Sequence, residues 1–253
     1  MHPVLSAILG SMQGDLARMD NVATNIVNAQ TVGYKREWMA ALPFATRVDE
    51  ASSAADVAGS SSARMLVQAD LRPGTLRATG QGLDLALSGP GWFEVRTAQG
   101  SAYTRQGNFR LDAQGRIVTQ AGDAVMGLGG DIQLASGAPV IDAQGRVFDT
   151  AADAAVPLAA RTPVGQLKLV QFEGSGPLQR LDGGLVLPAG EPVLAAEGST
   201  EVRQGFLENA NVSQMHEMVE LLQTLRHMES MQKVALGYDE MLGTTIRRLG
   251  EGA

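Results

Sequence analysis

The two ends of this chain share a hydrophobic pattern that the middle lacks. Near the N-terminus, apolar residues recur at alternating steps of four and three: Leu5, Leu9, Met12, Leu16, Met19, Ala23 and Ile26. A second run of the same period lies near the C-terminus: Met218, Leu221, Leu225, Met228, Ala235, Leu242, Ile246 and Leu249. This spacing predicts a long helix at each end, with an apolar seam that packs against other helices.

Local signals indicate where the two helices begin and end. Pro3 suits a helix start, and Gly33 can adopt the left-handed conformation that ends a helix, so the first helix is expected over about residues 3–28. Residues 34–38 are expected to continue it as a short amphipathic segment.

The second helix begins at Ser213 or Asn211, either of which can cap it, with Glu217 in the first turn. It continues to about Leu249 and spans about 54 Å at 1.5 Å per residue. A helix of this length needs a partner along most of its surface.

The middle of the chain follows the two-residue period of β-strands. Leu83, Leu85 and Leu87 alternate with other residues, and strands follow around residues 92–95 and 103–105. An Asp-Ala-Gln-Gly-Arg sequence occurs twice, beginning at Asp112 and at Asp142, and its Asp and Gly positions fit type I turns between paired strands.

These patterns predict an α+β fold with long N- and C-terminal helices that form a coiled-coil-like layer and an inserted, mostly antiparallel β domain. Residues 1–44 hold the first helix and the turn after it, and residues 45–63, rich in small and polar side chains, form a flexible linker. Residues 64–204 form the β domain. Residues 205–253 hold the C-terminal helix, which pairs with the first.

Composition excludes several classes of function. The 253 residues carry a formal net charge of -7 and no cysteine, which argues against nucleic-acid binding, disulfides and thiolate chemistry. No stretch reaches the roughly 18 consecutive apolar residues of a membrane helix, so no membrane insertion is expected. Residues 1–14 lack the basic start of a secretion signal, so no signal cleavage is expected.

No set of residues makes a convincing catalytic or metal site. His216, Glu220, Gln223 and His227 share one helix face, but their spacing differs from His-Glu-x-x-His, and a solvated or intersubunit polar face is expected instead. We therefore predict no catalytic residue, no metal and no cofactor. Two alternatives stay open. The turn aspartates Asp84, Asp112, Asp131, Asp142 and Asp182 could supply a hydrolase pair, and Trp92 with Phe93 could form a glycan-binding platform.

The segment after the first helix resembles the signature of bacterial flagellar axial proteins, the subunits of rod and hook. The matching residues are Asn25, Asn28, Thr31, Gly33, Tyr34, Lys35 and Arg36, and the departures are Thr24 and Val27. Similar family patterns occur in Thr79–Phe93, in Tyr103–Phe109 with its Tyr-Thr-Arg, and in Gln204–Val212 with its Leu-Glu. Residues 164–172 and the Leu-Gln-Arg-Leu that follows look like the proximal-rod member, with the distal-rod member as the alternative.

The resemblance implies a structural protein of the flagellar basal body and not an enzyme. Its partners would be other rod subunits, copies of itself and the flagellar type III export apparatus, which passes the chain uncleaved to the rod in the periplasm. The terminal helices would polymerise into the helical drive shaft that carries torque from motor to hook. The resemblance and the two seams together assign the assembly interface to Leu5, Leu9, Met12, Leu16, Met19, Ile26, Met218, Leu221, Leu225, Met228 and Leu242.

Overall fold

A computed structural model describes residues 3–41, 65–135, 138–150, 161–172, 178–188, 190–196 and 198–251. The chain divides into two compact units. The helical unit contains Met1–Val27, Glu37–Gln68 and Ser213–Ala253, and the β unit contains Asn28–Arg36 and Ala69–Val212. The linker expected at residues 45–63 lies outside the described residues.

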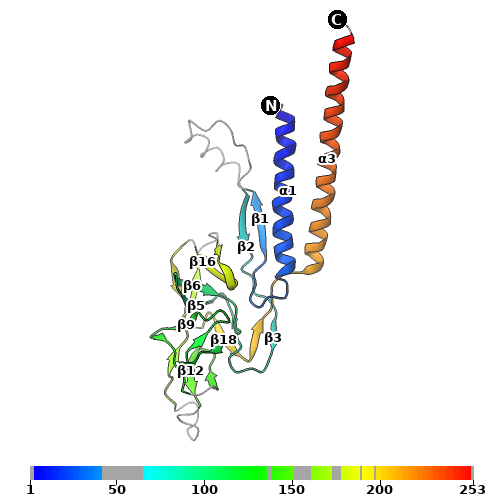
Figure 1. The fold of residues 1–253 in the computed structure, drawn as a ribbon. Helices are drawn as coiled ribbons and strands as arrows, with labels where there is room; N and C mark the ends of the chain where they lie inside the picture. The colour runs from blue at the N-terminus through cyan, green and yellow to red at the C-terminus, as the bar shows by residue number, and fades with distance from the viewer. Residues whose placement is uncertain are drawn as a thin grey trace. The chain divides into compact units, whose positions relative to one another are not determined.

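Two long helices dominate the helical unit (Figure 1): α1 over Pro3–Val27 and α3 over Gln214–Glu251. Both helices were predicted by the apolar periodicity, which is confirmed. The carbonyl of Ser213 accepts the first helical bond of α3, from the Glu217 amide at 3.0 Å. The residues after α1 are not a helical continuation, and that prediction is wrong: Glu37–Ala41 form strand β1, which pairs with β2 at Met65–Ala69.

Helices α1 and α3 pack against each other in antiparallel orientation (Figure 1). Asp15 contacts His227 and Asn25 contacts Glu217, so residue numbers rise along α1 as they fall along α3. In this register the first turn of α1 lies near residue 239. The last dozen residues of α3 therefore extend past the start of α1, by about 18 Å.

The expected coiled-coil-like layer is wrong, although the α+β class stands. In the described residues, one helix from each end forms a single pair, and most of the remaining elements are antiparallel strands. The leucine stripe also does not form the buried face of α1. The buried positions that recur every seven residues are Ile8, Asp15 and Val22. Pattern reading missed this face because it treats a charged residue such as Asp15 as solvent-facing.

The β unit contains many short strands. They are β3 (Leu76–Ala78), β4 (Leu85–Ser88), β5 (Trp92–Thr97), β6 (Gly100–Thr104), β7 (Arg110–Leu111), β8 (Ile117–Val118), β9 (Ala124–Gly127), β10 (Gly130–Asp131), β11 (Pro139–Ile141), β12 (Arg146–Asp149), β13 (Gly165–Gln166), β14 (Leu169–Phe172), β15 (Leu178–Arg180), β16 (Leu185–Pro188), β17 (Pro192–Leu194), β18 (Glu201–Gln204) and β19 (Phe206–Glu208). A short 3₁₀ helix, η2, covers Asp182–Gly184.

The largest sheet has the order β15-β16-β6-β5-β9-β8-β7, with β14 on β5 and β17, and β10 on β9. A second sheet has the order β11-β12-β13, and the pairs β18-β4 and β19-β3 bring late strands against early ones. Each described register is antiparallel, as the sequence predicted. The apolar core forms around Phe93, whose ring meets the edge of Phe109 at 5.1 Å.

The two Asp-Ala-Gln-Gly-Arg sequences form matching turns, which confirms that prediction. In the first, the Asp112 carboxylate accepts bonds from the Arg116 amide at 2.8 Å and its Nε at 2.7 Å. In the second, Asp142 accepts the equivalent bonds from Arg146 at 2.9 and 2.6 Å. Gly115 and Gly145 adopt positive φ angles of 75° and 76°. The repeated sequence therefore encodes a repeated hairpin.

Candidate functional site

One face of helix α1 carries exposed leucines. Leu5, Leu9 and Leu16 are 41%, 51% and 46% exposed, although they belong to the most regular apolar stripe of the sequence. Met12, Met19 and Ile26, from the same stripe, are half-buried. An apolar stripe that its own helix pair leaves open is typical of a surface that contacts another protein.

Helix α3 also carries exposed apolar residues. Met218 and Leu225 are 50% and 39% exposed. Leu221, Met228 and Leu242, the other residues predicted for the interface, are half-buried. The structure adds exposed apolar residues that the sequence reading did not assign: Met215, Val219, Leu222, Val234, Leu236 and Met241. We call these exposed residues of α1 and α3 together the apolar helix surface.

The buried seam between the two helices is largely polar. The Asp15 carboxylate lies 2.6 Å from Nδ1 of His227, and Asp15 is buried. Asn25 donates to the fully buried Glu217 at 3.1 Å. The same Asn25 side chain bonds both the amide and the carbonyl of Glu37, at 2.9 and 2.8 Å. Asn25 therefore ties the end of α1 to α3 and to β1.

The polar face of α3 formed by His216, Glu220, Gln223 and His227 has a structural role at one end. His227 serves the seam with Asp15, while Nε2 of His216 lies 3.6 Å from the Glu220 carboxylate on the surface of α3. Among the described residues, no group of three or more His, Cys, Asp or Glu could hold a metal ion. The described helices also include none that is long and apolar enough to cross a membrane.

Residues 28–36 of the signature lie in the β unit, whereas Asn25 belongs to the helical unit. Thr31 donates its amide to the Asn28 carbonyl at 2.9 Å and its hydroxyl to the Asn28 side chain at 3.1 Å. Gly33 has a φ of 67° and lies directly against the backbone of Arg105. The guanidinium of Arg180 stacks over the Tyr34 ring at 4.2 Å. These contacts hold residues 28–36 against the rest of the β unit.

Lys35 belongs to a buried group of three charges. Its ammonium lies 2.6 Å from one oxygen of the Glu208 carboxylate, and Arg105 lies 3.0 Å from the other. All three side chains are at most 3% exposed. Burial is the largest influence on Lys35 and lowers its pKa below 10.5, while Glu208 opposes the shift and Arg105 adds to it. Burial likewise lowers the pKa of Arg105.

Sequence reasoning assigned Lys35 to the signature but did not connect it with Arg105 or Glu208. Both partners lie in segments that also resemble the family: Arg105 in the Tyr-Thr-Arg of residues 103–109, and Glu208 in the Leu-Glu of residues 204–212. Arg105 directly follows β6, and Glu208 is the last residue of β19. The sequence lacked the pairing itself, because the three residues are far apart along the chain.

The aspartates and aromatic residues considered for other functions are occupied within the fold. Asp112 and Asp142 hold their own turns, and Asp131 lies 3.3 Å from Arg96. Trp92 and Phe93 are buried, so they form core and not an exposed platform. Neither alternative of the sequence reading gains support from these positions.

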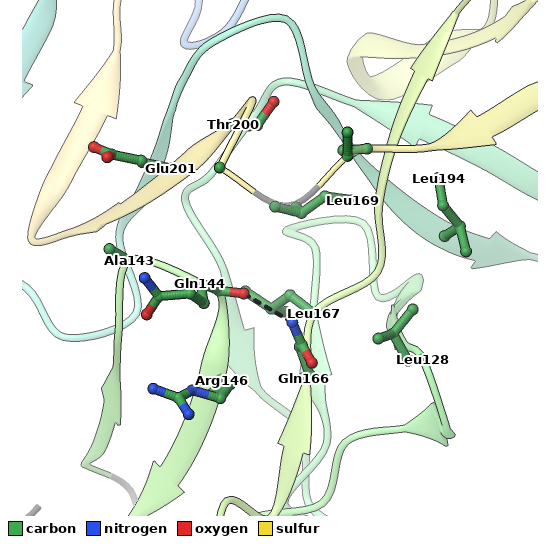
Figure 2. A pocket seen from close by; sticks show the side chains of 13 residues that line it. Leu128, Ala143, Gln144, Arg146, Gln166, Leu167, Leu169, Leu194, Thr200 and Glu201 are labelled. Atoms are coloured by element: carbon green, nitrogen blue, oxygen red, sulfur yellow. Dashed lines mark hydrogen bonds between the residues drawn. The ribbon is translucent and has the colours of Figure 1, made fainter. Parts of the chain in front are cut away.

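A cavity of about 600 Å³ opens on the β unit (Figure 2). Figure 2 shows Arg146 with Gln144 and Gln166 along one part of the lining, and Leu128 and Leu194 along another. The side-chain amide of Gln166 donates to the backbone carbonyl of Gln144 at 3.0 Å. The described lining contains one carboxylate, from Glu201, and so offers no acid–base pair.

Comparison with known proteins gives consistent matches. Residues 86–149 match the domain family described as the flagellar hook protein FlgE/F/G D1 domain, and residues 203–248 match the flagellar basal body rod FlgEFG protein C-terminal family. The chain is 34% identical over 249 residues to the flagellar basal-body rod protein FlgF of Salmonella typhimurium, with 96% of each chain covered. It is 33% identical to FlgF of Escherichia coli, also over 96% of each chain. Identity to the rod protein FlgG of Bacillus subtilis is 28%, over 96% of this chain and 97% of that protein.

Proposed function

Because the chain belongs to the flagellar basal-body rod protein family and is a structural subunit of the rod, we propose that it polymerises through its apolar helix surface. The shaft built in this way would carry torque from the motor to the hook. The observation that carries the proposal is the set of half-exposed leucines and methionines on α1 and α3, such as Leu9 and Met218.

Burial of these side chains by a neighbouring subunit would stabilise the contact. Complete burial of a leucine or methionine contributes about 1.5–3 kcal/mol, and side chains already half-buried would contribute roughly half as much. Several such residues on each helix are enough to offset part of the cost of association. Contacts between two different surfaces of the same subunit do not close into a ring unless the rotation allows it, and they build a helical polymer.

The proposed position is the proximal rod. Residues 164–172 resemble the proximal-rod member, and the identities of 34% and 33% to FlgF proteins exceed the 28% to an FlgG protein. The distal rod is the second candidate. In the rod, the partners would be other rod subunits and copies of this chain.

Location and export extend the same proposal. The family places the chain in the flagellar basal body. We propose that the type III export apparatus delivers it, without signal cleavage, to the rod in the periplasm. In this role the chain needs no catalytic residue and no cofactor.

Leu225→Asp tests polymerisation directly. Leu225 is 39% exposed, so the aspartate should leave the monomer folded while it places a charge in the subunit contact. A deletion strain that expresses this variant should lack assembled rods and motility. Leu194→Asp, on the exposed edge of the β unit, is the matched control and should assemble. Motility of the Leu225→Asp strain at the wild-type level would refute the proposed interface.

A further inference from the structure

Glu208 is contacted by three separate segments of the β unit. Its carboxylate accepts from Lys35 at 2.6 Å, from the Gly74 amide at 2.8 Å and from Arg105 at 3.0 Å. Its backbone carbonyl accepts from the Gly33 amide at 2.7 Å. Two cations thus share one buried carboxylate, and the removal of Glu208 would leave both of them without a counter-charge.

A second set of bonds lies next to this hub. Asn211 accepts from the Arg36 amide at 2.6 Å and donates to the carbonyls of Asp70 and Arg72 at 2.8 and 2.9 Å. The Asp70 amide donates to the Arg36 carbonyl at 2.7 Å, and the Asn211 amide to the Tyr34 carbonyl at 3.3 Å. The segments 28–36, 69–74 and 208–212 are therefore bonded to one another.

These three segments contain all the points at which the chain leaves the β unit for the helical unit. The chain passes between the units after residues 27, 36, 68 and 212. Arg105 connects the group to the body of the β unit, because it also donates to the carbonyls of Gly89 at 2.6 Å and Leu87 at 3.5 Å.

We infer that the Lys35–Glu208–Arg105 triad and Asn211 form a mechanical clamp, in which the β unit holds all four chain passages together so that none can be pulled away alone. The inference rests on the proposed torque-carrying role. A load that enters through any passage must break bonds to the other two segments, and separation of residues 28–36 from residues 208–212 must also break the buried Lys35–Glu208 ion pair. The clamp therefore opposes the separation of any one of the three segments from the β unit and distributes an applied force over all three.

Pulling on single purified molecules tests the clamp. The sequence has no cysteine, so introduced cysteines give unique attachment points. Handles at Gln30→Cys and Gln99→Cys, both exposed, load the signature segment against the body of the β unit. Handles at Gln99→Cys and Ala113→Cys load the body alone. Lys35→Met leaves Glu208 paired with Arg105, so the fold should persist. The variant loses the ion pair that holds residues 28–36 to Glu208.

Lys35→Met should raise the rupture rate across the 30/99 handles roughly ten-fold or more at constant load, and leave the 99/113 rate unchanged. Asn211→Ala, which removes only the three side-chain bonds of the second set, should show the same selectivity. Glu94→Gln is the matched control: it removes the partner of Lys168, 2.7 Å away, outside the clamp, and should not change the 30/99 rate. An unchanged 30/99 rate in both Lys35→Met and Asn211→Ala, or an equal increase in both geometries, would overturn the clamp. Because this measurement uses isolated protein, that result would leave the polymerisation test with Leu225→Asp unaffected.

Discussion

Gly33 lies so close to Arg105 that a side chain on it would overlap the backbone. A Cβ built on Gly33 would be 2.4 Å from the carbonyl carbon of Arg105, and the φ of 67° is unfavourable for other residues. This contact brings the signature segment directly against the end of β6, next to the buried triad. The glycine is therefore required twice, by its own conformation and by the close approach.

Gly33→Ala should strongly destabilise the β unit. The left-handed conformation costs an alanine about 1 kcal/mol, and overlap with backbone adds about 1–3 kcal/mol. Gly80→Ala is the matched control, because Gly80 has a φ of 73° but nothing within 4 Å of its Cβ position. Urea denaturation should show the larger loss for Gly33→Ala. Equal losses in the two variants would contradict the close approach.

Two neighbours on α1 should behave in opposite ways. Ile8 is 6% exposed and Leu9 is 51% exposed. Ile8→Ala should lower the free energy of unfolding of the helical unit by about 2–4 kcal/mol through cavity formation, whereas Leu9→Ala should change it by less than about 0.5 kcal/mol. Circular dichroism during denaturation of the monomer measures both.

Leu9 should matter for rod assembly although it contributes little to the stability of the monomer. Leu9→Ala should weaken incorporation into rods in a deletion strain even though its monomer is stable, because its exposed surface would be buried only by a neighbour. Wild-type incorporation of Leu9→Ala and Leu9→Asp together would remove Leu9 from the interface.

The Ile8 and Leu9 positions also show where sequence reasoning succeeds and fails. The period of apolar residues predicts both helices, since it depends only on residues close in the chain. The buried face depends on partners far away: Asp15 is buried because His227 lies 2.6 Å from it, on the other helix. Pattern reading counts such a residue as polar surface and selects the leucine stripe in its place.

The same limit explains strand β1. The amphipathic pattern of residues 34–38 favours a helix, but Glu37–Ala41 form a strand that pairs with β2, about 25 residues later in the chain. In contrast, the Asp112 and Asp142 turns were predicted, because the bonds of each turn fall within five residues. Contacts between residues close in the chain could be predicted from the sequence. The contacts of Lys35 with Arg105 and Glu208 could not, because the three residues come together only in the folded structure.

The Asp15–His227 contact should contribute measurably to the helix pair. Asp15→Asn keeps the shape of the side chain but removes its charge, and it should lower the stability of the helical unit by about 1–3 kcal/mol. Asp20→Asn, on an exposed position of the same helix, should have little effect. A double-mutant cycle with His227→Gln should give a coupling of about 0.5–3 kcal/mol, and a coupling of zero would show that the contact contributes nothing to stability.

Lys35 should give the β unit a distinctive pH dependence. Burial lowers its pKa in the folded state below 10.5, so the folded chain loses this proton at a lower pH than the unfolded chain. Between the lowered value and 10.5 the unfolded state binds more protons, and stability must therefore rise with pH across this window. At lower pH both states are protonated, and the cost of the buried charge is present in full. Lys35→Met lacks this titration and is the reference, so the difference in unfolding free energy between wild type and Lys35→Met should shift in favour of wild type as the pH rises toward 10.5. Urea denaturation at a series of alkaline pH values measures this difference, and a shift in the opposite direction would mean that Glu208 stabilises the charged ammonium by more than burial disfavours it.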